Sequence, residues 1–185
     1  QVVEVMCHDE GTPSVLFDEV EGCPPGFRIL INWFTGTRKN LTLGFPENFN
    51  KLELSRGYST HTRNMKPVPH EIVDDGPVFE NVLEGDDIDV TKFPAPLWNP
   101  DDGGRYIGTG CFNITRDPDT GWINCGTYRV MIHDEKRVGL YISPGKHGRI
   151  HRDKYMAKGE PMPVCIVVGT DPLSFLTSST EVPEG

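Results

Sequence analysis

Short apolar runs separated by turn-forming residues recur along the chain. Two of them, Ser14–Phe17 and Phe27–Phe34, flank the sequence Gly-Cys-Pro-Pro-Gly at 22–26. Apolar runs of this length, bounded by Gly and Pro, are typical of β-strands. The pattern therefore predicts a two-stranded pairing near the N-terminus.

A helical spacing follows this pair of runs. Phe49 and Leu52 lie four and seven positions after Phe45, which places the three side chains on one face of an α-helix. We expect a short amphipathic helix that runs from Pro46 towards Arg56.

The middle of the chain has the composition of a linker. Between residues 65 and 100, prolines and acidic residues separate brief apolar pieces. Boundaries between compact regions fall in such segments. We predict a boundary at roughly Lys92–Asn99, with an N-terminal region at 1–95 and a second region at 96–185.

The second region contains a hairpin pattern. Strand formers fill Tyr106–Thr115 and Trp122–His133, and the Asp-Pro-Asp-Thr-Gly sequence at 117–121 between them is a strong turn signal. The later apolar spacing predicts a strand, a polar helix, a buried strand and a short helix that opens with proline. These elements are Arg137–Ser143, Gly148–Lys158, Val164–Val168 and Pro172–Ser179. The predicted fold class is a strand-rich α+β protein.

Charge and cysteine content narrow the classes of function. With 27 acidic and 18 basic side chains, the formal net charge is −9, which repels a phosphate backbone and argues against nucleic-acid binding. The longest apolar run, Phe27–Phe34, is too short to cross a bilayer, and no signal sequence is visible. Five cysteines, at positions 7, 23, 111, 125 and 165, have no CxxC spacing. They predict reduced thiols in the cytoplasm, with neither a disulfide framework nor a zinc site.

Candidate chemistry begins in the strand that follows the turn. In the segment Asn124–Arg129, Asn124, Gly126 and Tyr128 share one face of a strand, and Cys125, Thr127 and Arg129 share the other. A glycine inside a strand marks either a close approach by a ligand or backbone, or a bulge. The sequence leaves both explanations of Gly126 open.

A second candidate is the turn Ser143–Gly148. Its glycines lead into a helix, so we expect exposed backbone N–H groups that suit a phosphate, and His147 adds a potential metal ligand. Taken alone, a histidine in such a turn is more often a solvated loop residue than a metal ligand. The other histidines, for which we expect solvated positions, are His8, His61, His70, His133 and His151.

A third candidate lies near the C-terminus. We expect Thr177–Thr180 to place exposed hydroxyls and carbonyl oxygens at the end of a short helix. Hard cations and phosphates favour such oxygen-rich corners, although runs of Ser and Thr also end helices without binding anything.

Five segments, in order, resemble the UbiD family of prenylated-FMN-dependent decarboxylases. They are Phe93–Trp98, the run from Gly108 to Gly121, Asn124–Arg129, Pro144–His147 and Gly169–Pro172. The resemblance implies a small α/β N-terminal region followed by a partial split β-barrel of the flavin-reductase type. It also implies prenylated FMN as the cofactor and a small aromatic or α,β-unsaturated carboxylic acid as the substrate.

The resemblance also implies site residues. Asn124 and His147 would bind Mn²⁺, or Mg²⁺, against the cofactor phosphate, and Arg129 would be the catalytic arginine. The cofactor would lie against Asn124, Gly126, Thr127, Tyr128, Arg129, Lys146, His147, Ser178 and Ser179. A K⁺ ion would be held by carbonyls of Cys125, Thr177, Ser178 and Thr180.

The chain departs from the family at both ends. The family's metal-binding glutamate and two further glutamates fall after Gly185, and the usual leading helix is missing, so we expect a fragment of a longer protein that is inactive alone. Glu181 and Glu184 lie before the expected position and are not given these roles. Full-length family members suggest a homo-oligomer. Two alternatives remain open: a non-catalytic flavin-binding or assembly subunit completed by another chain, and an ordinary flavin reductase.

Overall fold

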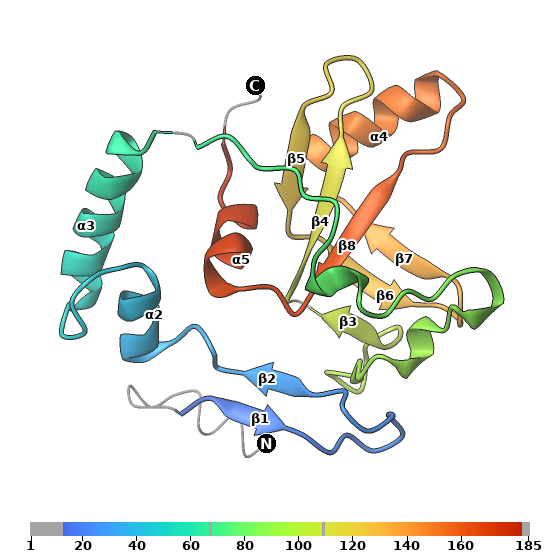
Figure 1. Cartoon of the computed structure of the whole chain (residues 1–185), viewed down its shortest axis with the longest axis horizontal. Coiled ribbons are helices and arrows are strands. Elements are labelled where there is room, and N and C mark those ends of the chain that lie inside the picture. The colour runs from blue at the N-terminus through green and yellow to red at the C-terminus, as the bar shows by residue number, and fades with distance from the viewer. Residues whose placement is uncertain (1–12, 67, 109, 183–185) are drawn as a thin grey trace. The chain divides into compact units, whose positions relative to one another are not determined.

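The computed structural model describes residues 13–66, 68–108 and 110–182 (Figure 1). His8, Cys7 and Glu184 therefore lie outside the described residues. The fold is mixed α/β. Its strands are β1 (Val15–Phe17), β2 (Ile29–Ile31), β3 (Tyr106–Gly108), β4 (Cys111–Arg116), β5 (Ile123–Gly126), β6 (Arg129–Ile132), β7 (Val138–Tyr141) and β8 (Val164–Val168). Its helices are α2 (Gly36–Thr42), α3 (Lys51–Asn64), α4 (His147–Ala157) and α5 (Pro172–Ser178), with 3-10 turns at Pro77–Phe79, Gly85–Asp87 and Val90–Lys92.

The backbone contacts divide the chain into two compact units. The first contains the chain up to Leu16 and Leu30–Ile88, and the second contains Phe17–Ile29 and the chain from Asp89 onward. The division into regions at residue 95 stays a prediction. None of the described helices is long and apolar enough to span a membrane.

Asn50 determines where the main helix of the first unit begins. Its side-chain oxygen accepts hydrogen bonds from the backbone N–H groups of Leu52 and Glu53, and the Glu53 carboxylate accepts one from the Asn50 N–H. This capping box satisfies N–H groups that have no partner inside the helix. The predicted helix start at Pro46 is therefore wrong: α3 begins at Lys51 and continues to Asn64. The predicted pairing of two N-terminal strands is confirmed as the β1–β2 sheet.

Two three-stranded sheets make up the second unit. Their strand orders are β3-β6-β7 and β5-β4-β8, and every described pairing is antiparallel. The turn between β4 and β5 is the one predicted: the Asp117 carboxylate accepts the N–H groups of Asp119 and Thr120, and Gly121 has a φ of 75°. Glycine adopts such a left-handed conformation without strain.

The predicted hairpin strands are each broken in two. β3 and β4 replace the first predicted strand, β5 and β6 replace the second, and β3 pairs with β6 while β4 pairs with β5. The halves of each predicted strand therefore belong to different sheets. The described strands do not close into a barrel, so the split-barrel architecture is not confirmed.

The later elements match their predictions more closely. β7, α4 and α5 lie within two residues of their predicted bounds, and β8 covers Val164–Val168 as expected. β8 is nevertheless not buried: Val164, Cys165 and Val168 are exposed. It is an edge strand that pairs with β4 on one side, so an apolar run here did not mean burial on both faces.

Candidate functional site

One pocket collects all the predicted site residues. It has a volume of about 750 Å³, within the range of small-molecule sites. Its walls come from β5, the start of β6, the turn before α4 and the end of α5. All nine predicted cofactor residues border it: Asn124, Gly126, Thr127, Tyr128, Arg129, Lys146, His147, Ser178 and Ser179. The predicted potassium-binding residues Cys125, Thr177 and Thr180 border it as well.

Gly126 is explained by the Tyr128 side chain. A Cβ built on Gly126 would lie 2.3 Å from the Tyr128 hydroxyl oxygen, a distance that no side chain tolerates. The chain leaves β5 at Gly126, and the Tyr128 ring folds back over that glycine. The group that approaches this glycine is therefore a side chain of the protein itself, which differs from the ligand or backbone segment that the sequence suggested.

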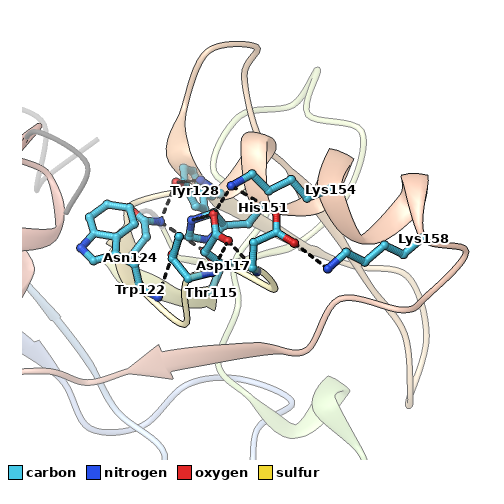
Figure 2. Close-up of polar contacts among 11 residues, drawn as sticks. Thr115, Asp117, Trp122, Asn124, Tyr128, His151, Lys154 and Lys158 are labelled. Carbon is cyan, nitrogen blue, oxygen red and sulfur yellow. Dashed lines mark hydrogen bonds and ion pairs between the residues drawn. The ribbon is translucent and has the colours of Figure 1, made fainter.

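The Tyr128 hydroxyl joins β5 to the beginning of α4. It accepts a hydrogen bond from the Asn124 amide nitrogen at 3.2 Å and another from the Gly148 backbone N–H at 3.1 Å (Figure 2). Gly148 is buried, and a Cβ there would lie 2.8 Å from the same tyrosine. The Tyr128 hydroxyl thus links the Asn124 side chain on β5 to the first turn of α4.

His147 borders the pocket as the first residue of α4. Its ring makes an edge-to-face contact with the Trp122 indole, with ring centroids 5.0 Å apart. Two N–H groups of the predicted turn are engaged within the protein: Lys146 donates to the Ser143 carbonyl, and Gly148 donates to the Tyr128 hydroxyl. Phosphate binding by the remaining N–H groups of this turn stays a prediction.

Lys146 carries positive charge to the pocket rim, where Glu181 pairs with it. The Lys146 Nζ and a Glu181 carboxylate oxygen are 3.1 Å apart, and both side chains are largely exposed. The hydrogen bond from Lys146 lowers the pKa of Glu181, and the charges of Lys146 and nearby His147 lower it further. Glu181 is therefore ionised at neutral pH.

The hydroxyls at the end of α5 are already used within the protein. Ser178 and Ser179 each donate to a carbonyl three residues earlier, those of Phe175 and Leu176. Because the single Ser178 hydroxyl proton is used in this way, the 3.2 Å contact with Thr127 is a hydrogen bond donated by Thr127. Ser178 is also buried, whereas exposed hydroxyls were expected. These groups can still accept hydrogen bonds or contact a cation.

Arg129 begins β6 and is exposed at the pocket wall. Within the described part of the chain it forms no ion pair, so its guanidinium can meet a ligand. A guanidinium binds carboxylates through two parallel N–H donors.

The described residues offer few metal ligands. Among residues 13–66, 68–108 and 110–182, no group of three His, Cys, Asp or Glu side chains is arranged so that it could hold a metal ion. Asn124 can contribute one amide oxygen, since both of its hydrogen bonds among described residues use the amide nitrogen. His147 can contribute one imidazole nitrogen. These residues fit part of a divalent-metal site, and further ligands would have to come from elsewhere.

A buried network behind Asn124 was missed by sequence reasoning. His151, expected to be solvated, is only 1% exposed. It contacts Thr115, and Trp122 lies against both His147 and His151. One signal was available in the sequence, since His147 and His151 are four residues apart and so share a helix face. Thr115 lies in the Gly108–Gly121 segment that resembles the family, but no role was predicted for it.

Residues 71–185 match the UbiD family profile, described as the 3-octaprenyl-4-hydroxybenzoate carboxy-lyase Rift-related domain. The chain is 28% identical to pyrrole-2-carboxylic acid decarboxylase of Pseudomonas aeruginosa, over 96% of this chain and 37% of that protein. It is 33% identical to ferulic acid decarboxylase 1 of Candida dubliniensis, over 94% of this chain and 34% of that protein.

Solved structures agree with these matches. The closed form of vanillic acid decarboxylase from Sedimentibacter hydroxybenzoicus superposes with a TM-score of 0.87 at 25% identity, over 99% of this chain and 40% of that one. The UbiD-class enzyme HmfF from Pelotomaculum thermopropionicum, in complex with prFMN, gives a TM-score of 0.81 at 25% identity, over 100% and 42%. The chain therefore spans well under half the length of these relatives. It belongs to the UbiD family.

Proposed function

We propose that this chain is the N-terminal and cofactor-binding part of a reversible, non-oxidative decarboxylase that uses prenylated FMN. The substrate would be an aromatic or α,β-unsaturated carboxylic acid. The observation that carries the proposal is the pocket bordered by all nine cofactor residues, in a chain that belongs to the UbiD family. Support for the cofactor comes from HmfF, a similar structure that holds prFMN.

The pocket residues divide into three tasks. Asn124 and His147 would hold Mn²⁺ or Mg²⁺ next to the cofactor phosphate, with Lys146 supplying positive charge. Carbonyls of Cys125, Thr177, Ser178 and Thr180 would hold K⁺, although the Thr177 carbonyl also accepts the Thr180 N–H. Arg129 would orient the substrate carboxylate with its planar fork.

The cofactor would supply what the side chains cannot. Loss of CO₂ leaves electron density on the substrate carbon, and prenylated FMN supplies an electron sink when bound. The protein's own residues bind the phosphate, orient the carboxylate and surround the reacting carbon. A proton must also be returned to that carbon, and no acid lies against Arg129 in the described residues. We therefore expect no turnover by this chain alone.

The further metal ligands and the acid that returns the proton would come from the remainder of the enzyme or from a complementary chain. Large apolar side chains that lack cover support this: Val68, Ile72 and Val78 are at least 80% exposed. The split β-barrel, a homo-oligomeric full-length form and a cytoplasmic location belong to the same proposal.

A flavin titration tests the proposal. The 185-residue chain should bind FMN more tightly than riboflavin, because only FMN carries the phosphate. Mn²⁺ should strengthen FMN binding but leave riboflavin unchanged. Asn124→Ala and His147→Ala should each abolish the Mn²⁺ effect, while His133→Ala, a histidine away from the pocket, should not. Equal binding of both flavins, unaffected by Mn²⁺, would contradict the proposal.

A non-catalytic flavin-binding or assembly subunit is the second candidate. It is favoured by the partial metal site and by the small share of the relatives' length that the chain covers. Decarboxylation assays separate the two. A chain that is the beginning of one enzyme gains activity when its own downstream sequence is appended, whereas a separate subunit gains it only from a different polypeptide.

A further inference from the structure

The inner face of β4 carries three buried polar side chains in a row. Asn113, Thr115 and Asp117 alternate along the strand and its end, and each is at most 1% exposed. Burial of polar groups costs free energy unless they are hydrogen-bonded. A face that would ordinarily be apolar is instead polar directly behind the pocket, so the partners of these groups indicate what they do.

Thr115 connects the pocket wall to α4. Its hydroxyl oxygen lies 3.3 Å from the Asn124 amide nitrogen and 3.0 Å from Nδ1 of His151 (Figure 2). On the other side of the His151 ring, Nε2 faces a carboxylate oxygen of Asp117 at 3.7 Å. Asp117 in turn pairs with Lys154, which lowers the pKa of that carboxyl group and keeps it charged. The groups lie in a row from the interior to Asn124; hydrogen bonds join Thr115 to Asn124 and His151, whereas the 3.7 Å contact between His151 and Asp117 is electrostatic.

The Asp117 charge selects the histidine tautomer. A neutral imidazole carries its proton on one nitrogen only, and a carboxylate facing Nε2 favours the proton there. Nδ1 is then an acceptor and takes the Thr115 hydroxyl proton. Because that hydroxyl has no second proton, its oxygen must accept from Asn124.

The amide of Asn124 is oriented as a consequence. Its nitrogen donates inward to the oxygens of Thr115 and Tyr128, which leaves its oxygen as the atom available to the pocket. With the opposite histidine tautomer, Thr115 and Tyr128 could both donate to an inward-facing Asn124 oxygen. The amide would then present N–H donors to the pocket, and a cation would meet the wrong group.

We propose that Thr115 and His151, with Asp117 behind them, are positioning residues that fix the Asn124 amide with its oxygen towards the pocket. The orientation is a property of the chain alone. Its consequence for cation binding rests on the proposed function. Partners of metal ligands commonly set affinity in this way, by about 10- to 100-fold.

Nuclear magnetic resonance of the metal-free, 185-residue chain tests the orientation directly. The ring nitrogens of His151 should show a protonated Nε2 and an unprotonated Nδ1, and the Asn124 side-chain NH₂ should give cross-relaxation to the Thr115 methyl group and the Tyr128 ring. Thr115→Val keeps the shape of the side chain and removes the hydroxyl. It should therefore shift the resonances of the Asn124 NH₂ group and speed the exchange of its protons with solvent. Thr115→Ser keeps the hydroxyl and should preserve the wild-type pattern.

Electron paramagnetic resonance of Mn²⁺, recorded with FMN present so that its phosphate can add a ligand to the partial site, gives the functional readout. Thr115→Val should weaken Mn²⁺ binding by about tenfold or more. Thr115→Ser should bind Mn²⁺ as tightly as the wild type does. A protonated Nδ1 in the wild type overturns the proposal even if Thr115→Val does not fold. Asn124 resonances that are the same in Thr115→Val as in the wild type would also overturn the proposal. Failure of the wild type to bind Mn²⁺ would instead refute the proposed function, while the resonance experiment still decides the orientation.

Discussion

At the scale of single residues, Glu181 opposes the proposed task of Lys146. The Glu181 carboxylate lies 3.1 Å from the Lys146 ammonium on the rim of the pocket. A phosphate that approached Lys146 would compete with this carboxylate and be repelled by its charge. Glu181 therefore acts against anion binding as long as it is ionised.

Replacing Glu181 with glutamine should strengthen FMN binding. The neutral amide frees Lys146 and removes the repulsion, and we expect about a fivefold lower dissociation constant for FMN in low salt. The effect should shrink as salt is added, because both side chains are exposed to solvent. Flavin fluorescence titration in the presence of a chelator measures it.

Riboflavin and Glu160→Gln are the controls for this charge effect. Riboflavin lacks the phosphate, so Glu181→Gln should not change its affinity. Glu160 is an exposed acid just beyond the end of α4 and does not border the pocket, so its replacement should leave FMN binding unchanged. Weaker FMN binding by Glu181→Gln would contradict the expected repulsion.

At the scale of elements, the capping box of α3 gives a direct stability prediction. Asn50→Ala removes the acceptor for the N–H groups of Leu52 and Glu53, which should cost about 1 kcal/mol. Urea denaturation followed by circular dichroism measures the loss. Asn64→Ala, at the other end of the helix, removes only a bond to the Thr60 carbonyl and should cost less. If both variants lost the same free energy of unfolding, the cap at Asn50 would stabilise the helix no more than the single bond at Asn64 does.

Local pattern predicted most elements of the second unit but not their pairing. The turn at 117–121, β7, α4 and α5 depend on residues close in sequence, and all lie near their expected positions. The breaks between β3 and β4 and between β5 and β6 were not predicted. A period-two pattern is the same whether a strand continues or changes sheet, so the partners of each half could not be read from it.

The same distinction applies to the site. The pocket residues lie in short motifs, and their resemblance to a family is enough to identify them from the sequence. The support of these residues depends on a long-range contact: Thr115 lies in the Gly108–Gly121 motif, where it was given no role, and His151 lies outside the motifs. The two are 36 positions apart and meet only when α4 packs near β4. The lining of the pocket could therefore be predicted from sequence, whereas the groups that orient it follow from the packing of α4 and β4.

At the scale of the whole molecule, acid stability should depend on Asp117. This carboxyl group is buried, and the hydrogen bond from Lys154, followed by those from the N–H groups of Asp119 and Thr120, lowers its pKa below the ordinary value of 3.8. In the unfolded chain the group has its ordinary pKa and takes up a proton first. Its contribution to stability is thus fully present above about pH 5 and is lost as the pH falls towards the lower folded pKa.

Asp117→Asn should therefore make the free energy of unfolding depend less on pH in the acid range. The amide keeps an oxygen for the backbone N–H groups but cannot pair with Lys154, so the variant should be less stable than wild type at neutral pH. The difference should begin to narrow between about pH 5 and pH 3, because wild type starts to lose this contribution there and the variant has none to lose. Urea midpoints across this range measure it. Asp119→Asn is the matched control: its carboxylate pairs with Lys158 but is half exposed, so solvent screens the pair and its effect should be smaller. A stability difference between wild type and Asp117→Asn that stayed constant with pH would show that the side chain acts through packing and hydrogen bonds, with no contribution from its charge.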